Sequence, residues 1–119
     1  VARWQLFAPL GKPRHGSAEV CCLEFEGALD WIAFGVWLSM LLRCHGERIL
    51  RVKGILDVLD SPQPIVIHGV QHCLHAPVHL NAWPGGVRRS RLVFIVRELD
   101  TLTLRRSFNA FLARLGRAA

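Results

Sequence analysis

The sequence predicts an α+β domain, a two-layer sandwich in which two helices cover one face of an antiparallel sheet of about four strands. Three observations lead to this prediction. Hydrophobic residues recur with a period of two in several short segments and with a period near 3.6 in two longer ones. These segments follow one another in the order β-α-β-β-β-α. The chain has 119 residues, of which 51% are hydrophobic, so it can form one domain with a substantial core.

The first residues differ in character from the rest. Residues 1–17 show no hydrophobic period and carry several prolines and glycines, which is typical of a linker. We therefore expect the domain to span residues 18–119. Since the first residue is Val1 and Met40 is the only methionine, we also expect further chain before this segment.

The first strand and the first helix are predicted over residues 20–25 and 31–45. VCCLEF is a short apolar run between two glutamates, as in a buried strand. Asp30 is a suitable N-cap for the helix, and Gly46 is placed to end it in the left-handed conformation.

The predicted helix is apolar on two sides. Its core stripe has the spacing of a buried helix face and consists of Phe34, Trp37, Leu38 and Leu41. The opposite side is also apolar and carries Ile32, Val36 and Met40. We expect another element, or a domain outside this sequence, to cover that second side.

Two strands are predicted next, over residues 48–58 and 64–74. In the first, alternation puts Leu50, Val52, Leu56 and Val58 on one face and Ile49, Arg51, Lys53, Ile55 and Asp57 on the other. A turn is expected at residues 60–62, and Pro77 is expected to end the second strand.

The last strand is predicted over residues 91–97, followed by a helix that Asp100 caps. The stripe of this helix consists of Leu104, Phe108, Phe111, Leu112 and Leu115. If both helices cover one face of the sheet, the other face exposes a basic set of side chains: Arg51, Lys53, Arg91 and Arg97.

The net charge indicates which partners the protein can bind, and the cysteines indicate its cellular compartment. Lys and Arg number 15 and Asp and Glu number 9, which gives a net charge of +6 and favours anionic partners. Aromatic residues do not alternate with the basic ones on a strand, so we do not expect nucleic acid to be the partner. The four cysteines have no CxxC spacing, which favours reduced thiols and a cytoplasmic protein. The longest apolar run, residues 31–42, is shorter than the roughly 20 residues that span a bilayer, so we expect no membrane segment.

Motifs of catalysis are absent from the sequence. It contains no GxxxxGK[ST], GxSxG or HExxH, and its acidic residues are scattered. We therefore expect this chain to carry no catalytic site of its own.

The stretch HGVQHCLHAPVHL, residues 68–80, places four histidines and one cysteine in thirteen residues. In a straight strand His68 and His72 would lie roughly 13 Å apart, too far for one metal ion to bind both. A bend at Pro77 could instead bring His75 and His79 together, with Cys73 or His72 as a further ligand. The alternative is that these histidines are ordinary sheet and loop residues.

Four segments together resemble one family: FEGALDW (25–31), HGERILRVKGIL (45–56), PIVIHGVQHCLHAPVHLNAWP (64–84) and RRSRLVFIVREL (88–99). They resemble the C-terminal domain of CobW-type P-loop GTPases, a family linked to cobalamin biosynthesis and zinc delivery. The resemblance implies a GTPase domain before this sequence, which would hold GTP, Mg²⁺ and a cysteine-rich metal motif. It also implies that this chain docks on the GTPase domain and helps to recognise the protein that receives zinc or cobalt.

Three functional hypotheses follow. The first is a non-catalytic domain of a CobW-like metal chaperone, with Arg51, Lys53, Arg91, Arg97, Ile32, Val36 and Met40 as its interaction surface. The second is a self-contained metal-binding module that uses His72, His75 and His79, with Cys73 as an optional fourth ligand. The third, a basic RNA-binding module, rests on charge alone.

Overall fold

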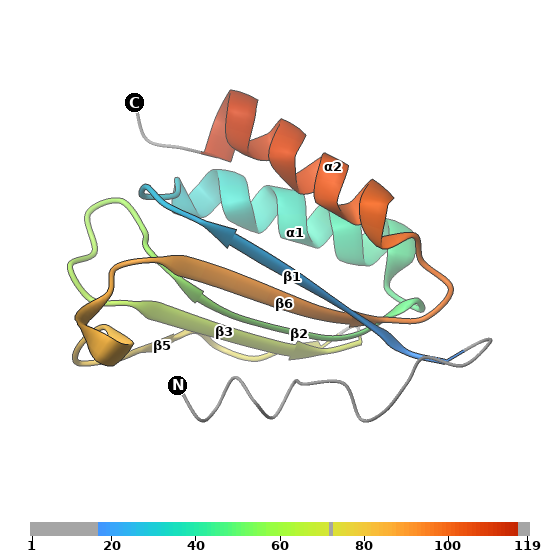
Figure 1. The fold of residues 1–119 in the computed structure, drawn as a ribbon, viewed down its shortest axis with the longest axis horizontal. Coiled ribbons are helices and arrows are strands. Elements are labelled where there is room, and N and C mark those ends of the chain that lie inside the picture. Colours follow the sequence, from blue (N-terminus) through green and yellow to red (C-terminus); the bar gives the residue numbers. More distant parts are fainter. Residues whose placement is uncertain (1–16, 72, 117–119) are drawn as a thin grey trace.

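The computed structural model of the protein describes residues 17–71 and 73–116. It confirms the predicted architecture: the two helices lie together on one face of an antiparallel sheet (Figure 1). The sheet has six strands, because two strands of two residues each add to the four long ones. The predicted linker, residues 1–17, lies outside the described residues except for Ser17.

The elements follow the predicted order, with the two short strands inserted after the third long strand. They are β1 (Glu19–Phe25), α1 (Trp31–His45), β2 (Ile49–Leu56), β3 (Ile65–Val70), β4 (Cys73–Leu74), β5 (Val78–His79), the 3-10 turn η2 (Pro84–Gly86), β6 (Ser90–Val96), α2 (Thr101–Phe111) and the π-helical turn η3 (Leu112–Gly116). The strand order is β1-β6-β2-β3-β4, and β5 also pairs with β3. The last strand in sequence thus lies between the first and the second.

Both helices begin where their caps were predicted. The side chain of Asp30 accepts a hydrogen bond from the backbone N–H of Ala33 at 2.9 Å. Asp100 accepts one from the N–H of Leu102 at 3.0 Å. These bonds satisfy N–H groups that have no partner inside the helix.

The predicted left-handed stop at Gly46 is wrong. Gly46 keeps a right-handed conformation, with φ −58° and ψ −30°. The chain instead leaves α1 through a turn closed by the N–H of Arg48, which donates to the carbonyl oxygen of His45 at 2.9 Å.

An aromatic cluster joins the helices to the sheet. The ring of Trp37 lies 5.1 Å from that of Phe108, 5.6 Å from Phe111 and 6.3 Å from Phe94. The predicted stripe of α1 therefore faces the core, and so does the described part of the α2 stripe: Leu104, Phe108, Phe111 and Leu112.

Ile49 in β2 faces the opposite side of the sheet from the one predicted. Ile49 pairs with Val96 and Arg51 pairs with Ile95, so Leu50 is the extra residue of a β-bulge. The bulge resets the alternation, and Ile49 is fully buried in the core instead of lying on the same face as Arg51.

The predicted continuous strand over residues 64–74 is also wrong. β3 ends at Val70, and β4 pairs back against it with Cys73 opposite Val70. Gln71 between them has φ 52°, a left-handed conformation that is uncommon for glutamine. Its N–H donates to the carbonyl oxygen of Leu50 at 3.1 Å, so the bulge in β2 anchors this reversal.

Candidate functional site

The outer side of α1 is the first candidate surface. Ile32, Val36 and Met40 follow one another at intervals of four residues and form one stripe, with exposed fractions of 78%, 55% and 61%. A row of apolar side chains this exposed is typical of a surface that another molecule or domain covers. We call these three residues the α1 stripe.

The second candidate surface is the sheet face opposite the two helices, which we call the open face. Partners in an antiparallel ladder share a face, so Arg51 lies here beside Val70, and Lys53 beside His68. Arg91 shares the face and pairs with Glu24, whose carboxylate lies 2.9 Å from its guanidinium. Arg97 is exposed directly after β6. The basic side chains named from the sequence thus gather on the open face and at its rim.

Apolar residues occupy the centre of the open face. Val93 pairs with Lys53, and Ile55 pairs with Arg91. Both are buried, with exposed fractions of 5% and 4%, although neither belongs to the core beneath the helices. The accessible part of this face is therefore its basic frame. On this face β2, β3 and β6 carry no Phe or Trp ring on which bases could stack, so the frame suits an acidic protein better than a nucleic acid.

The reversal at Gln71 brings two histidines together. His75 lies opposite His68, and its N–H donates to the carbonyl oxygen of His68 at 2.9 Å. The two imidazole rings are nearly parallel, at 11°, with 5.0 Å between their centroids. Partial burial, followed by the influence of His75, Arg51 and Lys53, lowers the pKa of His68 below its ordinary value. His68 is therefore held in its neutral form near pH 7.

The other proposed ligands lie elsewhere or outside the described residues. His79 pairs with Ile65, whose side chain is in the core, so His79 and His75 lie on opposite faces of the sheet. His72 is not among the described residues. Cys73 is exposed and shares the open face with His75. Within residues 17–71 and 73–116, no set of three His, Cys, Asp or Glu side chains is arranged to hold a metal ion.

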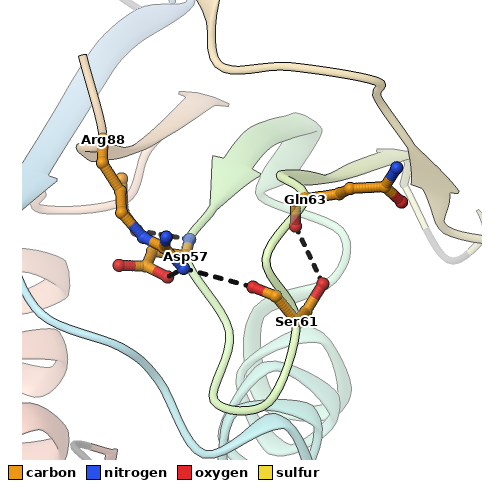
Figure 2. Close-up of polar contacts among 5 residues, drawn as sticks. Asp57, Ser61, Gln63 and Arg88 are labelled. Carbon is orange, nitrogen blue, oxygen red and sulfur yellow. Dashed lines mark hydrogen bonds and ion pairs between the residues drawn. The ribbon is translucent and has the colours of Figure 1, made fainter. Parts of the chain in front are cut away.

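A polar cluster that the sequence did not predict connects β2 to the start of β6. Arg88 donates to the carboxylate of Asp57 at 3.0 Å and to the carbonyl oxygen of Ser61 at 3.2 Å (Figure 2). Ser61 in turn donates to the carbonyl oxygen of Gln63 at 2.8 Å. The hydrogen bond to Asp57, and then its negative charge, raise the pKa of Arg88. Because both bonds of Arg88 tie the segment before β6 to the segment after β2, we assign this cluster a structural role.

The sequence carried only weak signals for the Asp57–Arg88 cluster and for the pair formed by His68 and His75. The alternation of β2 put Asp57 on the outer face but did not show that it would be buried. The sequence did not predict that a hairpin would pair His68 with His75, because no Asn-Gly or Asp-Gly dipeptide marks a turn at Gln71. A cross-strand partner seven residues away could be found only once that reversal was known.

Comparisons with known proteins agree with this architecture. The family model described as the cobalamin synthesis protein cobW C-terminal domain matches residues 18–112. The Zn(II)-bound YjiA GTPase from E. coli is similar in structure, with a TM-score of 0.70 and 22% sequence identity. A Zn(II)-bound triple mutant of the YjiA GTPase gives the same values. Each match covers 79% of this chain, which corresponds to 29% of the length of the matched chain. None of the helices among the described residues is long and apolar enough to cross a membrane.

Proposed function

The chain belongs to the cobalamin synthesis protein cobW C-terminal domain family, and we propose that it is the non-catalytic domain of a cytoplasmic, GTP-dependent metal chaperone. In this proposal it docks on the GTPase domain of its parent protein and helps to recognise the protein that receives the metal. GTP and Mg²⁺ bind to the GTPase domain, and zinc or cobalt is the cargo.

The α1 stripe carries the docking part of the proposal. The three apolar side chains of the stripe are more than half exposed to water, which is unfavourable. Covering them would stabilise the complex by about 25 cal/mol per Å² of buried apolar area. The chain spans 29% of the length of the structures it matches. A large part of those proteins therefore lies outside the matched domain, and a GTPase domain is the occupant that family membership supports.

The open face is proposed as the surface for the recipient protein. Its basic frame favours an acidic partner and accelerates association. Docking of the GTPase domain on α1 leaves this face accessible, since the helices and the open face lie on opposite sides of the sheet (Figure 1).

Binding to the separately purified GTPase domain tests the proposal. Ile32→Glu and Val36→Glu place a charge in the α1 stripe and should weaken binding, as measured by fluorescence anisotropy. Leu102→Glu on α2 is the matched control, because Leu102 is also apolar and 51% exposed but lies outside the stripe. This chain alone should bind no GTP, and saturable GTP binding by it would contradict a non-catalytic role.

A further inference from the structure

We propose that His68 and His75 together bind one divalent transition-metal ion on the open face of the sheet. This site is distinct from the α1 stripe, and it does not depend on the docking function proposed above. It differs from the ligand set considered from the sequence, because it uses His68 and omits His79.

The separation of the two rings fits a shared metal ion. A tetrahedral ion with metal–nitrogen distances of about 2.0–2.1 Å holds the centres of two imidazole ligands about 5 Å apart. The ring centroids of His68 and His75 are 5.0 Å apart. The backbone fixes this spacing, because the two residues lie opposite each other and share the hydrogen bond from the N–H of His75 to the carbonyl oxygen of His68.

One ring must turn for the ion to bind. A ligated metal lies near the plane of each imidazole, and two nearly parallel planes that are offset from each other do not meet at one point. His75 is exposed and follows the two-residue strand β4 at the end of the sheet order, so its ring can rotate about the Cβ–Cγ bond. His68 is partly buried on the longer strand β3 and supplies the fixed ligand.

The charges around the pair determine which ions it can bind. Neutral imidazole is the form of histidine that ligates a metal. The cations Arg51 and Lys53 oppose a divalent ion, and within the described residues no carboxylate joins the pair to form a three-ligand set. The pair therefore selects ions with strong affinity for nitrogen, such as Zn²⁺, Co²⁺, Ni²⁺ and Cu²⁺, over Mg²⁺ and Ca²⁺. Water completes the coordination.

Calorimetric titration of Zn²⁺ into the full chain tests the site. We expect one ion per chain, no binding of Mg²⁺, and loss of saturable Zn²⁺ binding in both His68→Gln and His75→Gln. Glutamine keeps polarity and approximate size, and circular dichroism confirms that each variant is folded. His79→Gln is the matched control and should retain binding, because His79 lies on the other face.

Two further variants distinguish a shared metal ion from a merely structural pair. Lys53→Gln removes a nearby positive charge, so it should tighten Zn²⁺ binding several-fold. Cys73→Ser should leave binding intact, because no thiolate takes part. The proposal is overturned if the wild-type chain binds no Zn²⁺, if binding survives both histidine substitutions, or if it is lost in His79→Gln or Cys73→Ser.

Discussion

The hydroxyl oxygen of Ser90 accepts a hydrogen bond from the backbone N–H of Asp57 at 2.8 Å, and Ser90 is fully buried. The first residue of β6 is thereby tied to the residue that follows β2. Ser90→Ala would leave a buried N–H without its acceptor, which costs about 1–3 kcal/mol. Chemical denaturation should show this loss of stability, and an unchanged midpoint would mean that water replaces the hydroxyl.

The ion pair between Arg88 and Asp57 should contribute more to thermal stability than the more exposed ion pairs of Arg89. Arg88→Ala removes the guanidinium that bonds the largely buried carboxylate of Asp57. Arg89→Ala removes contacts to Glu24 and Glu26, which are more exposed. We expect the first substitution to lower the melting temperature more than the second, because exposed ion pairs contribute little. Equal shifts in the melting temperature would contradict the structural role assigned to the polar cluster around Arg88 and Asp57.

Gly54 in the middle of β2 must lack a side chain. A Cβ there would lie 2.7 Å from Cδ1 of Leu92 and 3.2 Å from the carbonyl oxygen of Arg91. Gly54→Ala should therefore destabilise the fold by about 1–3 kcal/mol, as overpacking of a core does.

Gly35 in α1 provides the control for this prediction. A Cβ at Gly35 meets nothing within 4 Å, so Gly35→Ala should stabilise the helix by about 0.5–1 kcal/mol. Thermal melts of the two variants should thus shift in opposite directions, and a shared direction would count against the packing described around Gly54.

The cysteines should differ in reactivity. Burial raises the pKa of Cys21 and of Cys22, although part of the Cys22 side chain is exposed. A raised pKa means less of the reactive thiolate at a given pH, so alkylation of both should be slow at neutral pH and accelerate as the pH rises. Mass spectrometry should find the exposed Cys44 and Cys73 modified first at pH 7.5, and early modification of Cys22 would contradict the direction of its pKa shift.

Local patterns predicted most of the fold. Asp30 and Asp100 were identified as caps because a side-chain oxygen just before an apolar stripe is a local signal. The strand alternation placed Arg51, Lys53 and Arg91 on one face correctly, because side chains alternate between the two faces wherever a strand is regular.

What could not be predicted depends on contacts between distant segments. The bulge at Leu50 and the reversal at Gln71 support each other through one hydrogen bond between β2 and the end of β3. Neither residue carries a local signal of that role. The pairing of His68 with His75, on which the proposed metal site rests, follows from that reversal and was therefore not visible in the sequence.

Oxidation of Met40 tests the proposed docking most directly. Met40 is the only methionine of this chain, and it lies in the α1 stripe with 61% of its surface exposed. Dilute hydrogen peroxide converts an accessible methionine to its sulfoxide, which mass spectrometry quantifies. Met40 should oxidise more slowly in the parent protein with its GTPase domain than in this chain alone, and Val36→Glu should restore the faster rate while Leu102→Glu does not. Equal rates in the parent protein and the isolated chain would contradict docking through α1.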